Sequence, residues 1–167
     1  MSTATPPRVE MIDWHALAAA ERDAVRTLEI SARQIEFAGG VARSVAACEA
    51  GDPAAVAGLA VRVGRDIVGW VLLKRGASAP DWVDAGAAAV SGLRIALQHQ
   101  GRGIGPVALA EMARWVVRYW PESTRLMLRV DDANAAGIRA YEKAGWREVG
   151  PRLAGRVGLE RTMTLAL

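Results

Sequence analysis

An apolar segment that leads into a glycine-rich loop and then into an amphipathic helix constrains the fold of this chain more than any other feature. Ala87 to Leu97 is largely apolar and predicts a buried strand. The glycines of Gly101 to Gly105 follow, and apolar residues then recur with helical spacing from Ile104 until Pro121 ends the pattern. A further strand at Leu126 to Val130 completes a strand, crossover helix and strand, which predicts a right-handed parallel unit.

The other segments predict helices and antiparallel strands around this unit. Val56 to Val63 and Ile67 to Lys74 are apolar, and the turn residues Gly64 to Asp66 between them predict a β-hairpin. The remaining predicted elements are a strand at Val9 to Ile12, helical segments at Trp14 to Ile30, Ser31 to Ala50 and Ala133 to Ala144, and strands at Trp146 to Val149 and Val157 to Leu165. We therefore expect an α/β fold, called α+β in some schemes. Its mixed, mostly antiparallel sheet has a central parallel strand pair and is flanked by helices.

Length and hydropathy indicate one domain that does not enter a membrane. A chain of 167 residues is long enough to bury one core, so we expect a single domain over residues 1–167. Met1 to Pro7 lacks a basic stretch followed by an apolar one, which argues against a secretory signal and favours a flexible tail. No apolar run approaches the roughly 18 residues that a membrane helix needs. We expect a cytoplasmic protein without a membrane partner.

The composition argues against several kinds of site. The lone cysteine, Cys48, cannot form an internal disulfide, and His15 and His99 are too far apart to show metal-ligand spacing. We therefore expect no metal site. The net charge of +3 is compatible with nucleic-acid binding, but the arginines are scattered and form no basic run. We therefore expect no nucleic-acid partner.

The loop Gln100 to Gly105 predicts an anion-binding site. It precedes an amphipathic helix, whose first turn offers unpaired N–H groups and the positive end of the helix dipole. Glycines permit close backbone approach and positive φ, and Pro106 gives up an N–H that would lack a helical partner. The loop does not have the Gly-Lys-Ser/Thr ending of a P-loop, and its glycine spacing does not fit a dinucleotide fingerprint. A glycine-rich turn taken alone also fits a purely structural role.

Two motifs in this order resemble the GNAT superfamily of N-acetyltransferases. Gln100 to Gly105 is similar to the acetyl-CoA signature of that family, Gln/Arg-x-x-Gly-x-Gly/Ala after a long strand. The second motif resembles the pattern Asn-x-x-Ala/Gly-x-x-x-Tyr-x-x-x-Gly-Phe, with Trp146 in place of the commoner Phe. The residues that carry it are Leu128 to Val130, Asn134, Ala136 to Ile138, Tyr141, Lys143 and Gly145 to Trp146. The resemblance is best over residues 54–167. This part of the chain contains the acetyl-CoA-binding core that the resemblance implies.

This resemblance implies acetyl-CoA as the cofactor and a parallel strand pair that splays around it. The implied cofactor-binding residues are the backbone of Leu93, Arg94 and Ile95 along the pantetheine, Gln100, Gly101, Arg102, Gly103, Ile104 and Gly105 at the pyrophosphate, and Asn134 and Lys143 on the following helix. Tyr141 is the implied catalytic residue, because its phenol can donate a proton to the leaving thiolate. Asn134 and Tyr141 lie seven residues apart, nearly two helical turns, and share one helix face. A core role for Tyr141 and an N-cap role for Asn134 are the structural alternatives.

The acceptor of the amine proton is not apparent in the sequence. Many relatives carry a carboxylate on the strand before the loop, where this chain has Ser91 and Gly92. An amine with a pKa near 10 must lose a proton before it attacks, so another carboxylate or a water chain is needed. Glu36, Asp81 and Asp84 are the candidates, and each also fits a solvated surface charge.

We expect acetyl transfer to a primary amine, with a small-molecule amine as the partner. The alternatives are a protein or peptide N-acetyltransferase and a non-catalytic acyl-CoA-binding regulatory module. A loose resemblance to the diamine and polyamine acetyltransferases is carried by Gln34 to Phe37, Ser44 and Val68 to Trp70. The chain lacks the acidic cluster that a polycation prefers. Trp82 is a candidate for lining the acceptor pocket. The sequence does not fix the oligomeric state. A homodimer is one possible assembly, because the superfamily that the chain resembles often dimerises and Val157 to Leu165 offers a strand edge for pairing.

Overall fold

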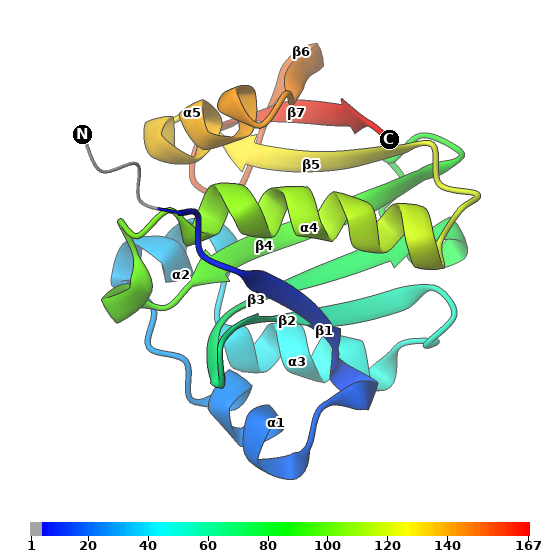
Figure 1. Ribbon diagram of the computed structural model, residues 1–167. Coiled ribbons are helices and arrows are strands. Elements are labelled where there is room, and N and C mark those ends of the chain that lie inside the picture. Colours follow the sequence, from blue (N-terminus) through cyan, green and yellow to red (C-terminus); the bar gives the residue numbers. More distant parts are fainter. Residues whose placement is uncertain (1–4) are drawn as a thin grey trace.

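The strand, crossover helix and strand form the middle of the structure, which is a computed structural model describing residues 5–167 (Figure 1). Strand β4 (Ala87–Ile95) leads through the glycine loop into helix α4 (Ile104–Tyr119), and β5 (Arg125–Asp131) returns parallel to β4. The parallel pairing is possible because a long helix separates the two strands. Of the tail predicted at Met1 to Pro7, residues 1–4 lie outside the described residues.

The sheet is mixed and mostly antiparallel, as predicted. Its strand order is β1-β2-β3-β4-β5-β7-β6, and β4 with β5 is its parallel pair within residues 5–167. The other strands are β1 (Val9–Asp13), β2 (Val56–Val63), β3 (Asp66–Arg75), β6 (Arg147–Ala154) and β7 (Leu159–Ala166). The other helices are α1 (Ala19–Arg26), α2 (Ala32–Ala38), α3 (Val41–Ala50) and α5 (Ala135–Lys143), with short 3-10 turns at Trp14–Ala16, Gly76–Ser78 and Leu97–His99.

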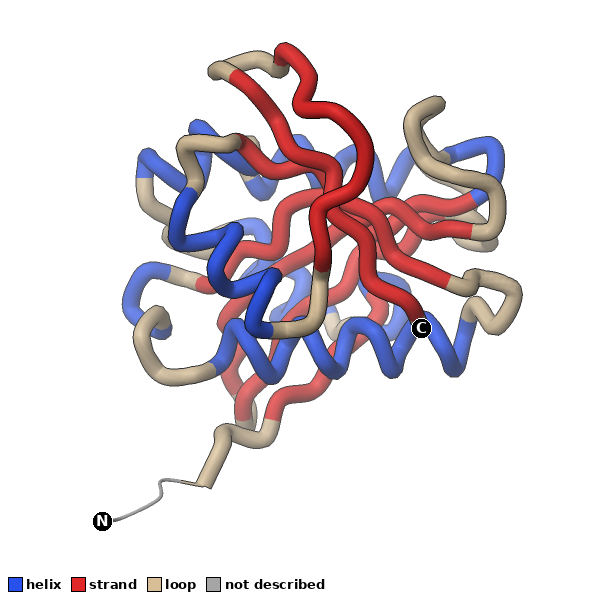
Figure 2. The backbone as a smooth tube through the Cα atoms, turned by 90° about the horizontal axis from the view of Figure 1, so that it is seen from above, coloured by secondary structure: helices blue, strands red, loops and turns tan. Residues whose placement is uncertain are grey.

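Helices cover both faces of the sheet, so its central strands are buried on both sides (Figure 2). Along β3, Val71 and Leu73 pack into the core beneath α4, whereas Trp70 and Leu72 pack against α1 and α3 on the opposite face. Side chains of successive strand residues point to opposite faces, which explains why almost the whole segment is apolar. The indole N–H of Trp70 donates to Ser44 Oγ at 2.9 Å, so this large buried side chain has its polar atom satisfied.

The first helical segment and the role of the last strand differ from the prediction. The segment Ser31 to Ala50 is divided into α2 and α3 at Gly39 and Gly40, and the strand expected over Trp146 to Val149 extends to Ala154 in β6. The helix expected over Trp14 to Ile30 is divided into a 3-10 turn and α1, because the extended residue Ala18 begins a new helix. The Glu21 carboxylate accepts from the Ala18 backbone N–H at 3.0 Å, which stabilises this second start. The last strand, β7, lies between β5 and β6 and offers no edge, so the edge of the sheet on this side is β6.

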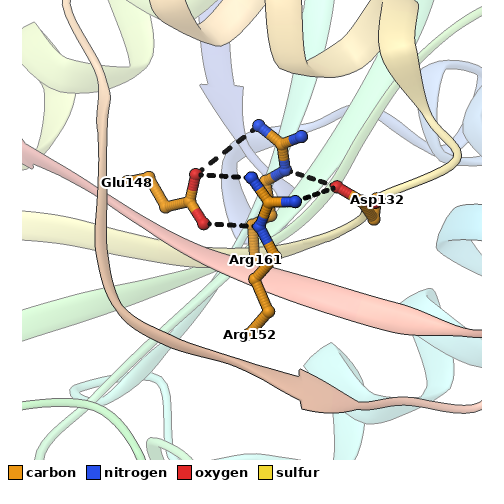
Figure 3. A network of polar contacts seen from close by, with 4 residues as sticks. All are labelled: Asp132, Glu148, Arg152 and Arg161. Carbon is orange, nitrogen blue, oxygen red and sulfur yellow. Dashed lines mark hydrogen bonds and ion pairs between the residues drawn. The ribbon is translucent and has the colours of Figure 1, made fainter.

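An ion-pair network joins the end of β5 to the β6–β7 hairpin (Figure 3). Arg161 Nε donates to Asp132 Oδ1 at 2.6 Å, and Arg152 Nε donates to Glu148 Oε1 at 2.9 Å. Arg152 and Arg161 together lower the pKa of Asp132 and Glu148, chiefly through these hydrogen bonds. The four side chains are solvated, so the network fixes the position of the hairpin relative to β5 more than it adds stability.

Candidate active site

The site begins where β4 and β5 separate. The two strands pair only at Ala87–Ala89 with Arg125–Met127, and no pairing continues beyond Ala89 and Met127 in the described chain. The following backbone groups, from Val90 on one strand and from Leu128 on the other, face each other across an opening. Unpaired strand edges of this kind are able to pair with an extended ligand.

A β-bulge in β4 marks the start of this opening. Ser91 pairs with Leu72 and Arg94 pairs with Trp70, so two residues of β4, Gly92 and Leu93, stand opposite one residue of β3. Gly92 has a φ of +52°, and a Cβ there would lie 2.8 Å from the Ala38 Cβ. Glycine is therefore required both by the bulge and by the close approach of α2.

A cavity of about 730 Å³ occupies the opening. Its walls come from β4, β5, α2 and α5, and it reaches the glycine loop at Gln100. Of the predicted site residues it brings together Leu93, Arg94, Gln100, Asn134 and Tyr141. Trp82 also lines it, with the Arg129 guanidinium 4.5 Å from its ring centroid.

The glycine loop has the conformation that an anion site needs. Gly101 and Gly103 have φ values of +72° and +76°, and Gly103 is the left-handed N-cap of α4. Neither an acidic side chain nor a side-chain cap occupies the first turn of α4, so its N–H donors remain available. A Cβ built at Gly101, Gly103 or Gly105 would meet no atom within 4 Å, which leaves space directly over the backbone.

Ile95 and Lys143 lie outside the main cavity. The Ile95 carbonyl accepts hydrogen bonds from the side-chain amides of Gln34 and Gln100, both at 3.0 Å, and so is already occupied. Lys143 lines a separate hollow of about 480 Å³ between α4 and α5, which also reaches Pro106 in the first turn of α4. These two residues therefore have different surroundings from Leu93 and Arg94.

Helix α5 places Asn134 and Tyr141 on the same wall of the cavity, as their spacing predicts. Asn134 is also the N-cap, because its Oδ1 accepts from the Gly137 backbone N–H at 3.0 Å. A Cβ at Gly137 would lie 2.6 Å from Asn134 Nδ2, so the absence of a side chain there lets the Asn134 amide fold over the helix end. The cap role and a ligand-facing position occur together.

Tyr141 combines a packed ring with a cavity-facing position. Its ring centroid lies 5.6 Å from that of Trp146, and the ring packs against the main core cluster. Burial raises the pKa of Tyr141 to about 12, with a partly opposing effect from the positive charge of Arg94. The phenol therefore keeps its proton throughout the neutral range and is a hydrogen-bond donor there.

The side chain of Arg94 is a buried cation without an anionic partner. It is 3% exposed, and its guanidinium donates to the backbone carbonyls of Ala38, Gly39 and Gly92. Within residues 5–167 it forms no ion pair with a carboxylate. Burial lowers the pKa of Arg94 to about 10, which leaves it charged at neutral pH. The sequence indicated only a backbone role for this residue.

The carboxylates nearest to this site are ones that the sequence did not single out. Asp131 and Glu160 both line the cavity and are Cα partners on β5 and β7. Asp131 is buried. It lies four residues after Met127, and Leu93 lies four residues after Ala89, the partner of Met127 in the last pair of β5 with β4. The predicted strand ended at Val130, one residue before Asp131, which belongs to β5.

The three carboxylates suggested by the sequence lie outside the cavity. Glu36 and Asp81 are exposed, and Asp84 is exposed and lies 3.4 Å from Arg125 in an ion pair. No group of three or more metal-ligating side chains occurs in the described part of the chain. No helix within residues 5–167 is long and apolar enough to cross a membrane.

Solved structures of acetyltransferases share this fold. The GNAT domain of PAT from S. lividans is 22% identical, with a TM-score of 0.71 over 96% of this chain and 90% of that chain. The spermidine N-acetyltransferase from Vibrio cholerae, solved with CoA and spermine, is 15% identical, with a TM-score of 0.73 and 95% of each chain covered. The aminoglycoside acetyltransferase AAC(6')-Ib, solved with coenzyme A, is 19% identical, with a TM-score of 0.68 and 95% of each chain covered.

The sequence comparisons give a family but no close relative. No curated protein sequence matches the chain. The acetyltransferase (GNAT) family matches residues 13–146, which extends from the end of β1 to the start of β6 and includes the bulge, the glycine loop and α5. The chain therefore belongs to the GNAT family of acetyltransferases.

Proposed function

We propose that this protein transfers the acetyl group of acetyl-CoA to the primary amine of a small molecule by direct attack of the amine on the thioester. The observation that carries this proposal is the cavity between the separated ends of β4 and β5, which holds Tyr141 and reaches the glycine loop at Gln100. A thioester that follows this opening would bring its sulfur toward Tyr141 while its phosphates remain at the loop. We also propose that residues 1–167 act as one domain in the cytoplasm.

The residues present fit the donor. The first-turn N–H groups of α4 and the open space over Gly101, Gly103 and Gly105 suit a pyrophosphate. The backbone of β4 at Leu93 and Arg94 has no strand partner on the β5 side, which suits the amide groups of a pantetheine arm that would add to the sheet there as an extra strand. The donor supplies an activated acetyl group whose thiolate can leave.

Asn134 and Lys143 complete the proposed donor site. Asn134 faces the main cavity from the N-terminus of α5, and its Nδ2 has no protein acceptor within residues 5–167. Lys143 lies at the hollow beside Pro106, where a cation suits the outer phosphate of the donor. Lys143 and Arg102, which is exposed in the loop, give the donor path a positive character.

The chain offers two means of stabilising negative charge during attack. We propose that a backbone N–H of the bulge at Leu93 donates to the thioester oxygen and that the buried charge of Arg94 adds to its effect. Tyr141 donates its O–H to the sulfur as the C–S bond breaks. Because the pKa of Tyr141 is raised to about 12, complete transfer of its proton to a thiolate is uphill. Tyr141 therefore acts chiefly by hydrogen bonding.

Asp131 is the proposed acceptor for the proton of the attacking amine, directly or through one water molecule. Its carboxylate lies in the wall opposite Leu93, and Glu160 beside it is the second candidate. Both are closer to the opening than the carboxylates on α2 and in the β3–β4 connection, which do not line the cavity.

Other assignments have less support. The cavity of about 730 Å³ leaves room for a peptide amine as an alternative acceptor. A non-catalytic acyl-CoA-binding module would not require the conjunction of Tyr141, Asp131 and Arg94 in one cavity. A homodimer is supported only by the exposed edge strand β6, which has free backbone groups along one side.

Replacing Tyr141 with Phe removes the hydroxyl but keeps the ring. We expect kcat to fall by about 10²- to 10³-fold, the range for loss of one positioned proton or hydrogen-bond donor, with CoA affinity nearly unchanged. Tyr119→Phe is the matched control, because Tyr119 is 54% exposed near the end of α4. The kcat of each variant is obtained from the rate of thiol release as a function of amine concentration. Equal kcat values for Tyr141→Phe and Tyr119→Phe would remove Tyr141 from the mechanism.

Replacing Gly103 with Ala tests the glycine loop. A non-glycine residue at its φ of +76° is strained by roughly 1–2 kcal/mol, and the methyl group enters the space reserved for phosphate. Gly64→Ala is the control, since Gly64 has a φ of +61° and open space but lies in the β2–β3 turn. Calorimetric titration with CoA should show at least about tenfold weaker binding for Gly103→Ala alone, while thermal unfolding shows similar losses for both. Unchanged CoA binding by Gly103→Ala would contradict the proposed pyrophosphate site.

Replacing Asp131 with Asn tests the proton acceptor. At pH 7 most of a primary amine is protonated, so we expect kcat/KM to fall by about 10- to 100-fold. The deficit should shrink toward pH 10, where the amine loses its proton without help. Asp84→Asn, which changes an exposed carboxylate outside the cavity, should leave the pH profile unchanged. If Asp131→Asn and Glu160→Gln both keep the parent profile, the proton leaves by another route.

A further inference from the structure

A second hollow lies beside the main cavity, against α2. It has a volume of about 450 Å³ and is bounded by α2, α3, β3 and β4. Phe37, Ala38, Ser91 and Arg94 line both hollows, so the C-terminal turn of α2 and the bulge of β4 form a shared wall. If the donor occupies the main cavity, as proposed above, an acceptor in this second hollow has its amine close to the shared wall.

The shared wall contains the unpaired charge of Arg94. Its Nε, Nη1 and Nη2 atoms each donate to one backbone carbonyl, and carbonyl dipoles compensate a full charge only in part. A guanidinium has five N–H groups, so one on each Nη remains without a protein acceptor among residues 5–167. A buried cation of this kind gains from an anion brought in by a ligand.

Two further arginines line the same hollow. Arg43 comes from the first turn of α3, and Arg156 comes from the turn between β6 and β7. Arg156 donates to the Glu36 carbonyl, which holds this turn against α2. Neither Arg43 nor Arg156 forms an ion pair within residues 5–167, and no carboxylate lines the hollow there.

We propose that the acceptor is an amine that also carries a carboxylate, which Arg43, Arg94 and Arg156 bind in this hollow. The planar guanidinium group matches a carboxylate with two parallel hydrogen bonds. Three guanidinium groups also repel a polycation, because like charges raise its free energy in a confined site. This acceptor class differs from spermine and kanamycin, the amines present in two of the similar solved structures.

The proposal rests on the acetyltransferase function and is tested with pairs of amines that differ only by the carboxylate. Lysine is compared with cadaverine, and 5-aminopentanoate with butylamine, with spermine as the polycation. We expect kcat/KM from thiol release to be about 10- to 100-fold higher for each carboxylate-bearing member, the range for charge-assisted hydrogen bonds.

Charge variants test which residues produce this preference. Arg43→Gln and Arg156→Gln should each reduce the preference about tenfold or more, with the effect on KM larger than that on kcat. Arg65→Gln, in the exposed β2–β3 turn, removes the same charge away from the hollow and should change nothing. Thermal unfolding of all three variants checks that each remains folded.

The outcomes separate this proposal from the function on which it rests. Turnover that favours cadaverine, butylamine or spermine would overturn the carboxylate assignment while supporting acetyl transfer. An unchanged preference in both Arg43→Gln and Arg156→Gln would also overturn it. Absence of thiol release with every amine, despite CoA binding, would reject the acetyltransferase function itself.

Discussion

The early end of pairing between β4 and β5 is the constraint on which the site depends. Parallel strands ordinarily continue side by side, but here only three residues of each strand pair before the two diverge. The bulge at Gly92 and Leu93 redirects β4, and the close contact of Gly92 with Ala38 brings α2 to the same point. The backbone groups beyond Ala89 are thereby left for a ligand, and the cavity is a direct consequence of this divergence.

Charge then divides the space around this opening. Asp131 and Glu160 belong to the wall formed by β5 and β7, whereas the hollow against α2 holds Arg43, Arg94 and Arg156 without a carboxylate in the described chain. In the mechanism that we propose, the carboxylate near the reacting amine removes a proton, and the cations farther along the acceptor path orient the substrate. The ion pairs of Asp132 and Arg161 hold the hairpin that carries Glu160 and Arg156 near β5.

The sequence predicted those parts of the protein that depend on local pattern. The β2–β3 hairpin, the glycine loop and α4 follow from turn residues and periodicity, and the spacing of Asn134 and Tyr141 places both on one face of α5. Asp131 was missed because it ends a strand and resembles a turn residue in sequence. Arg43, Arg94 and Arg156 converge only through tertiary packing of α3, β4 and the β6–β7 turn, and no spacing along the chain indicates that convergence. The edge role expected of the last strand was wrong, because strand order within the sheet is also set by tertiary packing.

We propose that the divergence of β4 and β5 holds the donor with its sulfur beside Tyr141. A crystal structure of the protein with CoA tests it most directly. We predict pantetheine amides hydrogen-bonded to the β4 backbone at Leu93 and Arg94, pyrophosphate over Gly101 to Gly105, and the sulfur within about 4 Å of the Tyr141 hydroxyl. A CoA molecule bound outside the opening, or a sulfur far from Tyr141 with the glycine loop empty, would contradict the account.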